Sequence, residues 1–121
     1  MDKIKSLYDE IEHMIVSEVG VQGHPFIYGK FEGLGWLDFQ YTSSAYEGPC
    51  PKIALKQQKN AVHLYVMSQT QGQPLLEKYV PIFGKTAVGK GCLRIKTLNE
   101  ARRNAITEIV RFAIEGQSYE T

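Results

Sequence analysis

The chain has 121 residues, of which 43% are hydrophobic and 22% are charged, and its formal net charge is +1. This length suits one domain with its own core, and a net charge near zero provides no global field to attract nucleic acid or a membrane surface. Two cysteines are too few for a disulfide framework and favour a cytoplasmic protein, and no segment approaches the roughly 20 apolar residues that span a bilayer.

The N-terminal segment 3–19 has the apolar spacing of an amphipathic helix. Its apolar residues are Ile4, Leu7, Tyr8, Ile11, Met14, Ile15 and Val19. Because they recur every three or four positions, a helix gathers them on one stripe. Gly20 and Gly23 predict the end of this helix.

Residues 26–68 change to the two-residue alternation of β-strands. The predicted strands are 26–32, 36–42, 52–58 and 61–68. A hairpin at Gly33-Leu34-Gly35 joins the first two, and a tight turn at Lys59-Asn60 joins the last two. Between the pairs, segment 43–51 holds Ser, Gly and two prolines around Cys50, and we expect a loop there.

The remaining part of the chain carries further helix and strand signals. The expected elements are a short helix from Pro74 to about Phe83, a loop at 84–91, a strand at 92–96 and a helix that ends before Gly116. Proline suits the first turn of the short helix, and Thr97 with Glu100 has the spacing of a capping box for the last helix. The predicted order is therefore α-β-β-β-β-α-β-α.

This order predicts an α+β fold, in which an antiparallel sheet of about five strands is flanked by the N-terminal and C-terminal helices. Alternation assigns to the helix-covered face Ile27, Phe31, Leu37, Phe39, Tyr41, Ile53, Leu55, Val62, Leu64, Val66, Leu93 and Ile95. The opposite, outer face then carries Tyr28, Lys30, Trp36, Asp38, Gln40, Lys56, His63, Tyr65, Met67, Cys92 and Arg94. This outer face is unusually rich in aromatic and polar groups for a plain solvated surface.

Three stretches resemble a known family. They are His24-Pro25, the strand Ala61-Val62-His63-Leu64-Tyr65-Val66, and Gly84-Lys85 followed by Gly89-Lys90-Gly91-Cys92-Leu93-Arg94-Ile95. In this order they resemble the YdhG-like bacterial proteins, some of which are described as frataxin-like. The resemblance covers roughly residues 24–115 and implies a single YdhG-like domain over 1–121, with a sheet flanked by terminal helices. It also suggests an intracellular iron-chaperone role, although the first helix here mixes Lys3 and Lys5 with its acidic residues, whereas frataxins carry a dense acidic ridge.

The loop Gly84–Gly91 comes close to a phosphate-binding motif. Its spacing nearly fits G-x-x-x-x-G-K-[ST], but Gly91 stands where the magnesium-binding hydroxyl belongs, and a strand follows instead of a helix. Nucleotide hydrolysis is therefore rejected. Two interpretations remain: backbone amides with Lys85 and Lys90 hold a small anion, or the glycines only make a turn.

Asp9, Glu12 and His13 form a candidate metal patch. They lie at i, i+3 and i+4 on the predicted first helix, away from its apolar stripe. Two carboxylates and an imidazole can hold a divalent ion such as iron loosely. The alternative is a solvated helix face with local ion pairs.

The outer sheet face is the main candidate for ligand binding. Tyr28, Trp36, His63, Tyr65 and Arg94 would form a platform on which aromatic rings stack against a flat ligand and the other two side chains make polar contacts. Single-stranded nucleic acid is disfavoured, because no basic stripe accompanies the platform. Two structural alternatives are that the helix near 75–83 covers this face, or that a second subunit covers it in a homodimer.

Three functions remain open at this point. We favour a non-catalytic domain that binds a small molecule or a protein through the outer sheet face and the loop 84–91, without a cofactor and without a membrane partner. The first alternative is a frataxin-like iron chaperone. The second is a small enzyme with its site around His63, which is disfavoured because no constellation shows paired acid–base geometry.

Overall fold

The computed structural model describes residues 3–28, 31–42, 47–66, 69–70, 73–89 and 92–115. Its helices are α1 (Lys3–Val19), α2 (Val80–Phe83) and α3 (Glu100–Glu115), with 3-10 turns η1 (Leu75–Tyr79) and η2 (Lys85–Ala87). Its strands are β1 (His24–Tyr28), β2 (Phe31–Thr42), β3 (Glu47–Gln57), β4 (Val62–Val66), β5 (Gln69–Thr70), β6 (Gln73–Pro74) and β7 (Cys92–Ile95).

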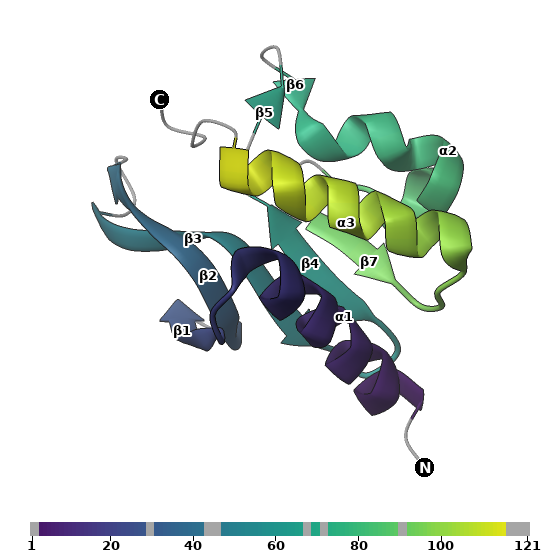
Figure 1. Cartoon of the computed structure of the whole chain (residues 1–121), viewed down its shortest axis with the longest axis horizontal. Coiled ribbons are helices and arrows are strands. Elements are labelled where there is room, and N and C mark those ends of the chain that lie inside the picture. Colours follow the sequence, from purple (N-terminus) through teal and green to yellow (C-terminus); the bar gives the residue numbers. More distant parts are fainter. Residues whose placement is uncertain are drawn as a thin grey trace.

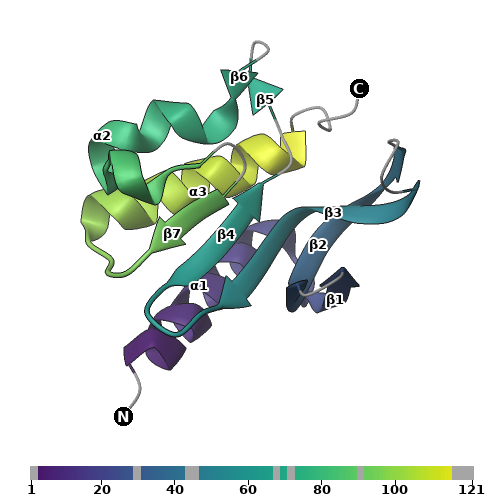
Figure 2. The same cartoon turned by 180° about the vertical axis from the view of Figure 1, so that it is seen from behind.

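One antiparallel sheet holds five of these strands in the order β1-β2-β3-β4-β7. Helices α1 and α3 lie on the same face of this sheet (Figure 1). Seen from behind, strands β3 and β4 lie in front of α1, so the outer face of the sheet is toward the viewer (Figure 2). The predicted α+β fold with terminal helices is confirmed, and a separate two-stranded sheet of β5 and β6 is an addition to it.

The core lies between the sheet and the two long helices. Its buried members include Ile11 and Ile15 of α1, Ile106, Ile109 and Val110 of α3, and Ile53, Leu55, Val62, Leu64, Leu93 and Ile95 of the sheet. The sheet residues follow the predicted alternation and occupy the predicted face, which explains why this face is covered. Among the described residues, none of the helices has the length and the apolar character needed to cross a membrane.

The segment that contains η1 and α2 packs beside α3 and not over the outer face of the sheet (Figure 2). The hydroxyl of Tyr79 donates to Glu108 Oε1 at 3.1 Å, and burial together with this bond raises the pKa of Tyr79. Arg102 Nε donates to the carbonyl oxygen of Ile82 at 3.4 Å. Of the two structural alternatives, covering of the outer face by the 75–83 segment is therefore wrong.

The first hairpin differs from its prediction. Tyr28, the last residue of β1, pairs with Phe31, the first residue of β2. The predicted turn residues Gly33, Leu34 and Gly35 therefore lie inside β2. Gly35 has a packing reason to be in a strand, because a Cβ there would lie 2.9 Å from Pro51 Cβ. Glycines in a strand can mark close approach of neighbours instead of a turn.

Trp36 lies on the helix-covered face and not on the outer face. It pairs with Ile53 across the sheet, is 1% exposed and belongs to the core. The neighbouring Leu37 also packs against the core, because its φ of 61° breaks the alternation of side chains along β2. Ile27, expected under the helices, is 68% exposed on the edge strand β1.

Three smaller predictions also change. The expected loop at 43–51 becomes strand from Glu47 onward, and the expected helix from Pro74 divides into the end of β6, the 3-10 turn η1 and the short α2. The last helix is capped by Asn99, whose Oδ1 accepts the backbone N–H of Arg102 at 2.8 Å. The hydroxyl of Thr97 instead accepts a bond from the guanidinium of Arg102, so the predicted capping box is wrong.

Candidate functional site

Three basic side chains stand side by side across the outer face of the sheet. Lys56 of β3 pairs with His63 of β4, and His63 pairs with Arg94 of β7. Directly opposed residues on antiparallel strands have Cβ atoms about 4.5–5.5 Å apart. We call Lys56, His63 and Arg94 the basic row.

A second row of less polar residues runs next to the basic row. Ala54 of β3 pairs with Tyr65 of β4, which pairs with Cys92 of β7. The hydroxyl of Tyr65 lies 3.4 Å from Nδ1 of His63, and their rings are tilted by 59° with centroids 6.2 Å apart. An aromatic ring therefore adjoins the middle member of the basic row.

The surroundings of His63, Tyr65 and Cys92 favour the uncharged form of each of these three side chains. Partial burial, then Arg94 and Lys56, lower the pKa of His63. Burial raises the pKa of Tyr65 and also that of Cys92. Near neutral pH His63 is therefore a neutral imidazole between Lys56 and Arg94, with the phenol of Tyr65 and the thiol of Cys92 in the neighbouring row.

The glycine–lysine loop meets the basic row at its β7 end. A guanidinium nitrogen of Arg94 donates to the carbonyl oxygen of Thr86, and the amide of Gly89 donates to the carbonyl oxygen of Cys92 at 2.8 Å. These bonds hold the loop along β7. An open depression of about 470 Å³ adjoins it, lined by Glu77, Val80, Lys85, Val88 and Gly89.

Of the residues predicted for the ligand platform, the structure brings His63, Tyr65 and Arg94 together. Lys85 is exposed on η2, next to the residue whose carbonyl oxygen binds Arg94. Trp36 is removed from the platform, because its indole is buried on the other face. The side chain of Tyr28 and all of Lys90 lie outside the described residues. Lys56 is an additional member of this surface: its place on the outer face was predicted, but a role in ligand binding was not.

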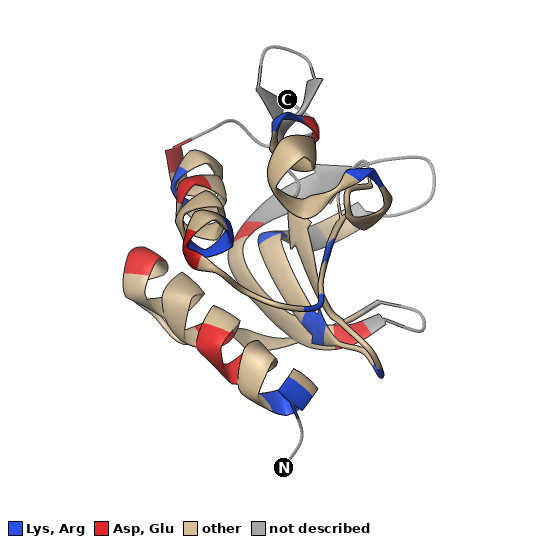
Figure 3. Cartoon of the chain, turned by 90° about the vertical axis from the view of Figure 1, so that its right-hand side faces the viewer, with Lys and Arg blue, Asp and Glu red and all other residues tan. Residues whose placement is uncertain are grey.

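One member of the predicted metal patch, Asp9, has another partner. Nζ of Lys5 binds Asp9 Oδ1 at 2.6 Å, and both side chains are exposed. Figure 3 shows the acidic residues spread along α1, with basic residues at its N-terminal end. Over the described residues, three or more His, Cys, Asp or Glu side chains do not gather into a group that could hold a metal ion. Metal binding by Asp9, Glu12 and His13 stays a prediction.

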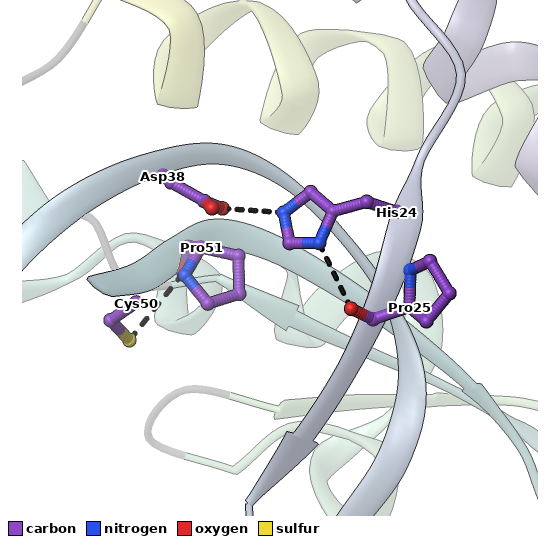
Figure 4. Close-up of polar contacts among 5 residues, drawn as sticks. All are labelled: His24, Pro25, Asp38, Cys50 and Pro51. Atoms are coloured by element: carbon purple, nitrogen blue, oxygen red, sulfur yellow. Dashed lines mark hydrogen bonds and ion pairs between the residues drawn. The ribbon is translucent and has the colours of Figure 1, made fainter. Parts of the chain in front are cut away.

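A second polar cluster, which the sequence did not reveal, lies between β1 and β2 (Figure 4). His24 Nε2 lies 2.8 Å from Asp38 Oδ1, and its Nδ1 lies 3.0 Å from the carbonyl oxygen of Pro25. Both ring nitrogens thus face acceptors, so the imidazolium satisfies both contacts. The hydrogen bond to Asp38 raises the pKa of His24 most. No spacing in the sequence indicates this pair, because fourteen residues separate its members.

Cys50 lies on the far side of Pro51 from His24 (Figure 4). Its thiol is 3.8 Å from the carbonyl oxygen of Pro51. Burial, with a smaller effect of Asp38, raises the pKa of Cys50. A thiol with a raised pKa is a weak nucleophile at neutral pH, so this cysteine is not poised for catalysis.

No family model, no curated protein and no solved structure matches the chain. The resemblance to the YdhG-like proteins thus stays a prediction.

Proposed function

We propose that this protein is a non-catalytic binding domain that recognises an anionic ligand, or an acidic group of a partner, on the outer face of β3, β4 and β7. The observation that carries the proposal is the basic row of Lys56, His63 and Arg94, set side by side on three adjacent strands. Arg94 also donates to the carbonyl oxygen of Thr86, which places the exposed Lys85 of the described loop residues 84–89 near the β7 end of this surface.

The two cations of the basic row lie on either side of His63, Lys56 on β3 and Arg94 on β7. Their charges contribute to the lowered pKa of His63, so both act at the position of this side chain. An anion placed over His63 would be attracted by both cations at once.

The protonation states support binding over catalysis. A catalytic acid, base or nucleophile has a pKa tuned toward the working pH, whereas the pKa of His63 is lowered and those of Tyr65 and Cys92 are raised. The thiol and the phenol therefore stay protonated near neutral pH. The ring of Tyr65 next to the row would contact the less polar part of the ligand.

A thermal-shift screen with anionic, neutral and cationic compounds tests this function. A ligand at one hundred times its Kd stabilises by about 2.7 kcal/mol, which is roughly 10 °C in the Tm of a chain of this length. We expect anionic compounds to give such shifts in the wild type and smaller shifts in Lys56→Gln.

Lys3→Gln is the matched control, because it makes the same change in net charge on the exposed surface of α1. It should respond to anions as the wild type does. Equal loss of the shift in both variants would show that only net charge matters, and a screen in which no anion stabilises the wild type would remove the proposal.

A further inference from the structure

The position of His63 within the basic row has a consequence for the regulation of binding. His63 lies on β4, between β3 and β7, so that Lys56 and Arg94 flank it from both sides. It is therefore the middle one of three side chains that an anion on this surface would contact. It is also the member of the row that titrates in the physiological range.

The groups that act on His63 come from all three strands of this surface. Lys56 faces it from β3, Arg94 faces it from β7, and Tyr65 contacts it from β4 itself, with Cys92 next to Tyr65. Without a ligand, partial burial and the two cations keep the imidazole neutral. The helices α1 and α3 lie on the other face of the sheet.

We infer that an anion bound at the basic row draws a proton onto His63, so that binding at this site strengthens as the solution becomes more acidic. The bound anion would offset the field of Lys56 and Arg94 and would accept a hydrogen bond from the imidazolium. This inference rests on the proposed function, and it adds a proton as the coupled second ligand.

Linkage fixes the sign and the size of the effect. If the anion favours the imidazolium, then the imidazolium favours the anion by the same factor. Between the pKa of His63 in the free protein, which lies below its ordinary value, and its higher pKa in the complex, Kd falls by up to about tenfold for each unit by which the pH is lowered. Above both pKa values, Lys56 and Arg94 bind the anion without help from His63.

Sulfate is a suitable probe because it stays a dianion across the whole range, so the pH dependence reports on the protein. The chain has three histidines, and their ring resonances can be titrated by NMR with and without saturating sulfate. We expect the pKa of His63 to rise in sulfate, while that of His24 stays unchanged because His24 lies on β1. The Kd for sulfate should fall at least severalfold from about pH 8 to about pH 5.5.

Two variants keep the test sharp. His63→Gln retains a polar side chain and should bind sulfate with a Kd that no longer depends on pH, whereas His24→Gln should keep the wild-type dependence. If sulfate shifts the backbone resonances of β3, β4 and β7 but leaves the pKa of His63 unchanged, the proton coupling is wrong and the proposed function stands. If sulfate and the other anions of the screen leave these strands unaffected, both are wrong.

Discussion

Gly23→Ala tests where the single tryptophan of this protein lies. Segment 21–23 runs between α1 and β1 and passes against the indole of Trp36. The indole Nε1 donates to the carbonyl oxygen of Val21 at 3.1 Å. A Cβ at position 23 would lie 2.6 Å from Cζ2, 2.7 Å from Cε2 and 3.0 Å from Cη2 of the indole.

The magnitude follows from these distances. Carbon atoms in ordinary contact are about 3.5–4.0 Å apart, so the ring or the segment must move by roughly 1 Å. Trp36 is 1% exposed, so the ring has little open space to enter. Overpacking of a closed core destabilises by about 1–3 kcal/mol, and we expect Gly23→Ala to fall in the middle of this range, near ~2 kcal/mol.

Urea unfolding followed by circular dichroism measures this loss, and a double-mutant cycle assigns it to the indole. Trp36→Phe removes the part of the ring that a Cβ at position 23 would meet. The double variant should therefore be more stable than the sum of the single effects predicts, by about 1 kcal/mol. Gly20→Ala is the control: its φ of 91° strains the backbone but its Cβ meets nothing within 4 Å, so its effect should add to that of Trp36→Phe.

Two results would refute this reasoning. One is a Gly23→Ala protein as stable as the wild type. The other is strict additivity between Gly23→Ala and Trp36→Phe, which would mean that the two positions do not share the same space. Either would return Trp36 to the list of candidate ligand-binding residues.

Three further predictions concern stability. Asn99→Ala removes the cap of α3 and should lower the free energy of unfolding by about 1 kcal/mol in urea. His24→Gln loses the contact with Asp38 and should lower the free energy of unfolding by roughly 0.2–1 kcal/mol. Since the pKa of His24 is raised in the folded protein, the full loss should be seen below the unfolded-state pKa, and it should vanish as pH rises through the folded-state pKa. Comparing the Tm of the variant and the wild type at about pH 5 and about pH 8 would show this. Arg111→Gln breaks the exposed pair with Glu18 and should lower the Tm only slightly, an effect that high salt abolishes.

The secondary structure of the long elements could be predicted from the sequence. The helix at 3–19 has the predicted bounds, because a stripe of apolar side chains every three to four residues can be buried only by a helix. Strands β3, β4 and β7 alternate so regularly that their covered face was also predicted correctly. For this reason the sequence alone predicts that His63, Tyr65 and Arg94 share one face.

Alternation failed where the backbone departs from a regular strand. The φ of 61° at Leu37 turns two successive side chains, Trp36 and Leu37, toward the core. The sequence did not indicate this, because leucine rarely adopts a positive φ. Trp36 was therefore assigned to the wrong face. Gly33 and Gly35 suggested a turn by composition, whereas the close approach of Pro51 explains Gly35.

The fold class, the two long helices and the identity of the outer-face residues on the central strands could be predicted from the sequence, since each depends on the periodicity of one segment. The register between strands depends on how the sheet packs, and register is what sets Lys56, His63 and Arg94 in one row. The same applies to His24 and Asp38, and to the packing of η1 and α2 beside α3. Such contacts join residues that are distant along the chain, so their geometry arises only when the sheet and its helices pack.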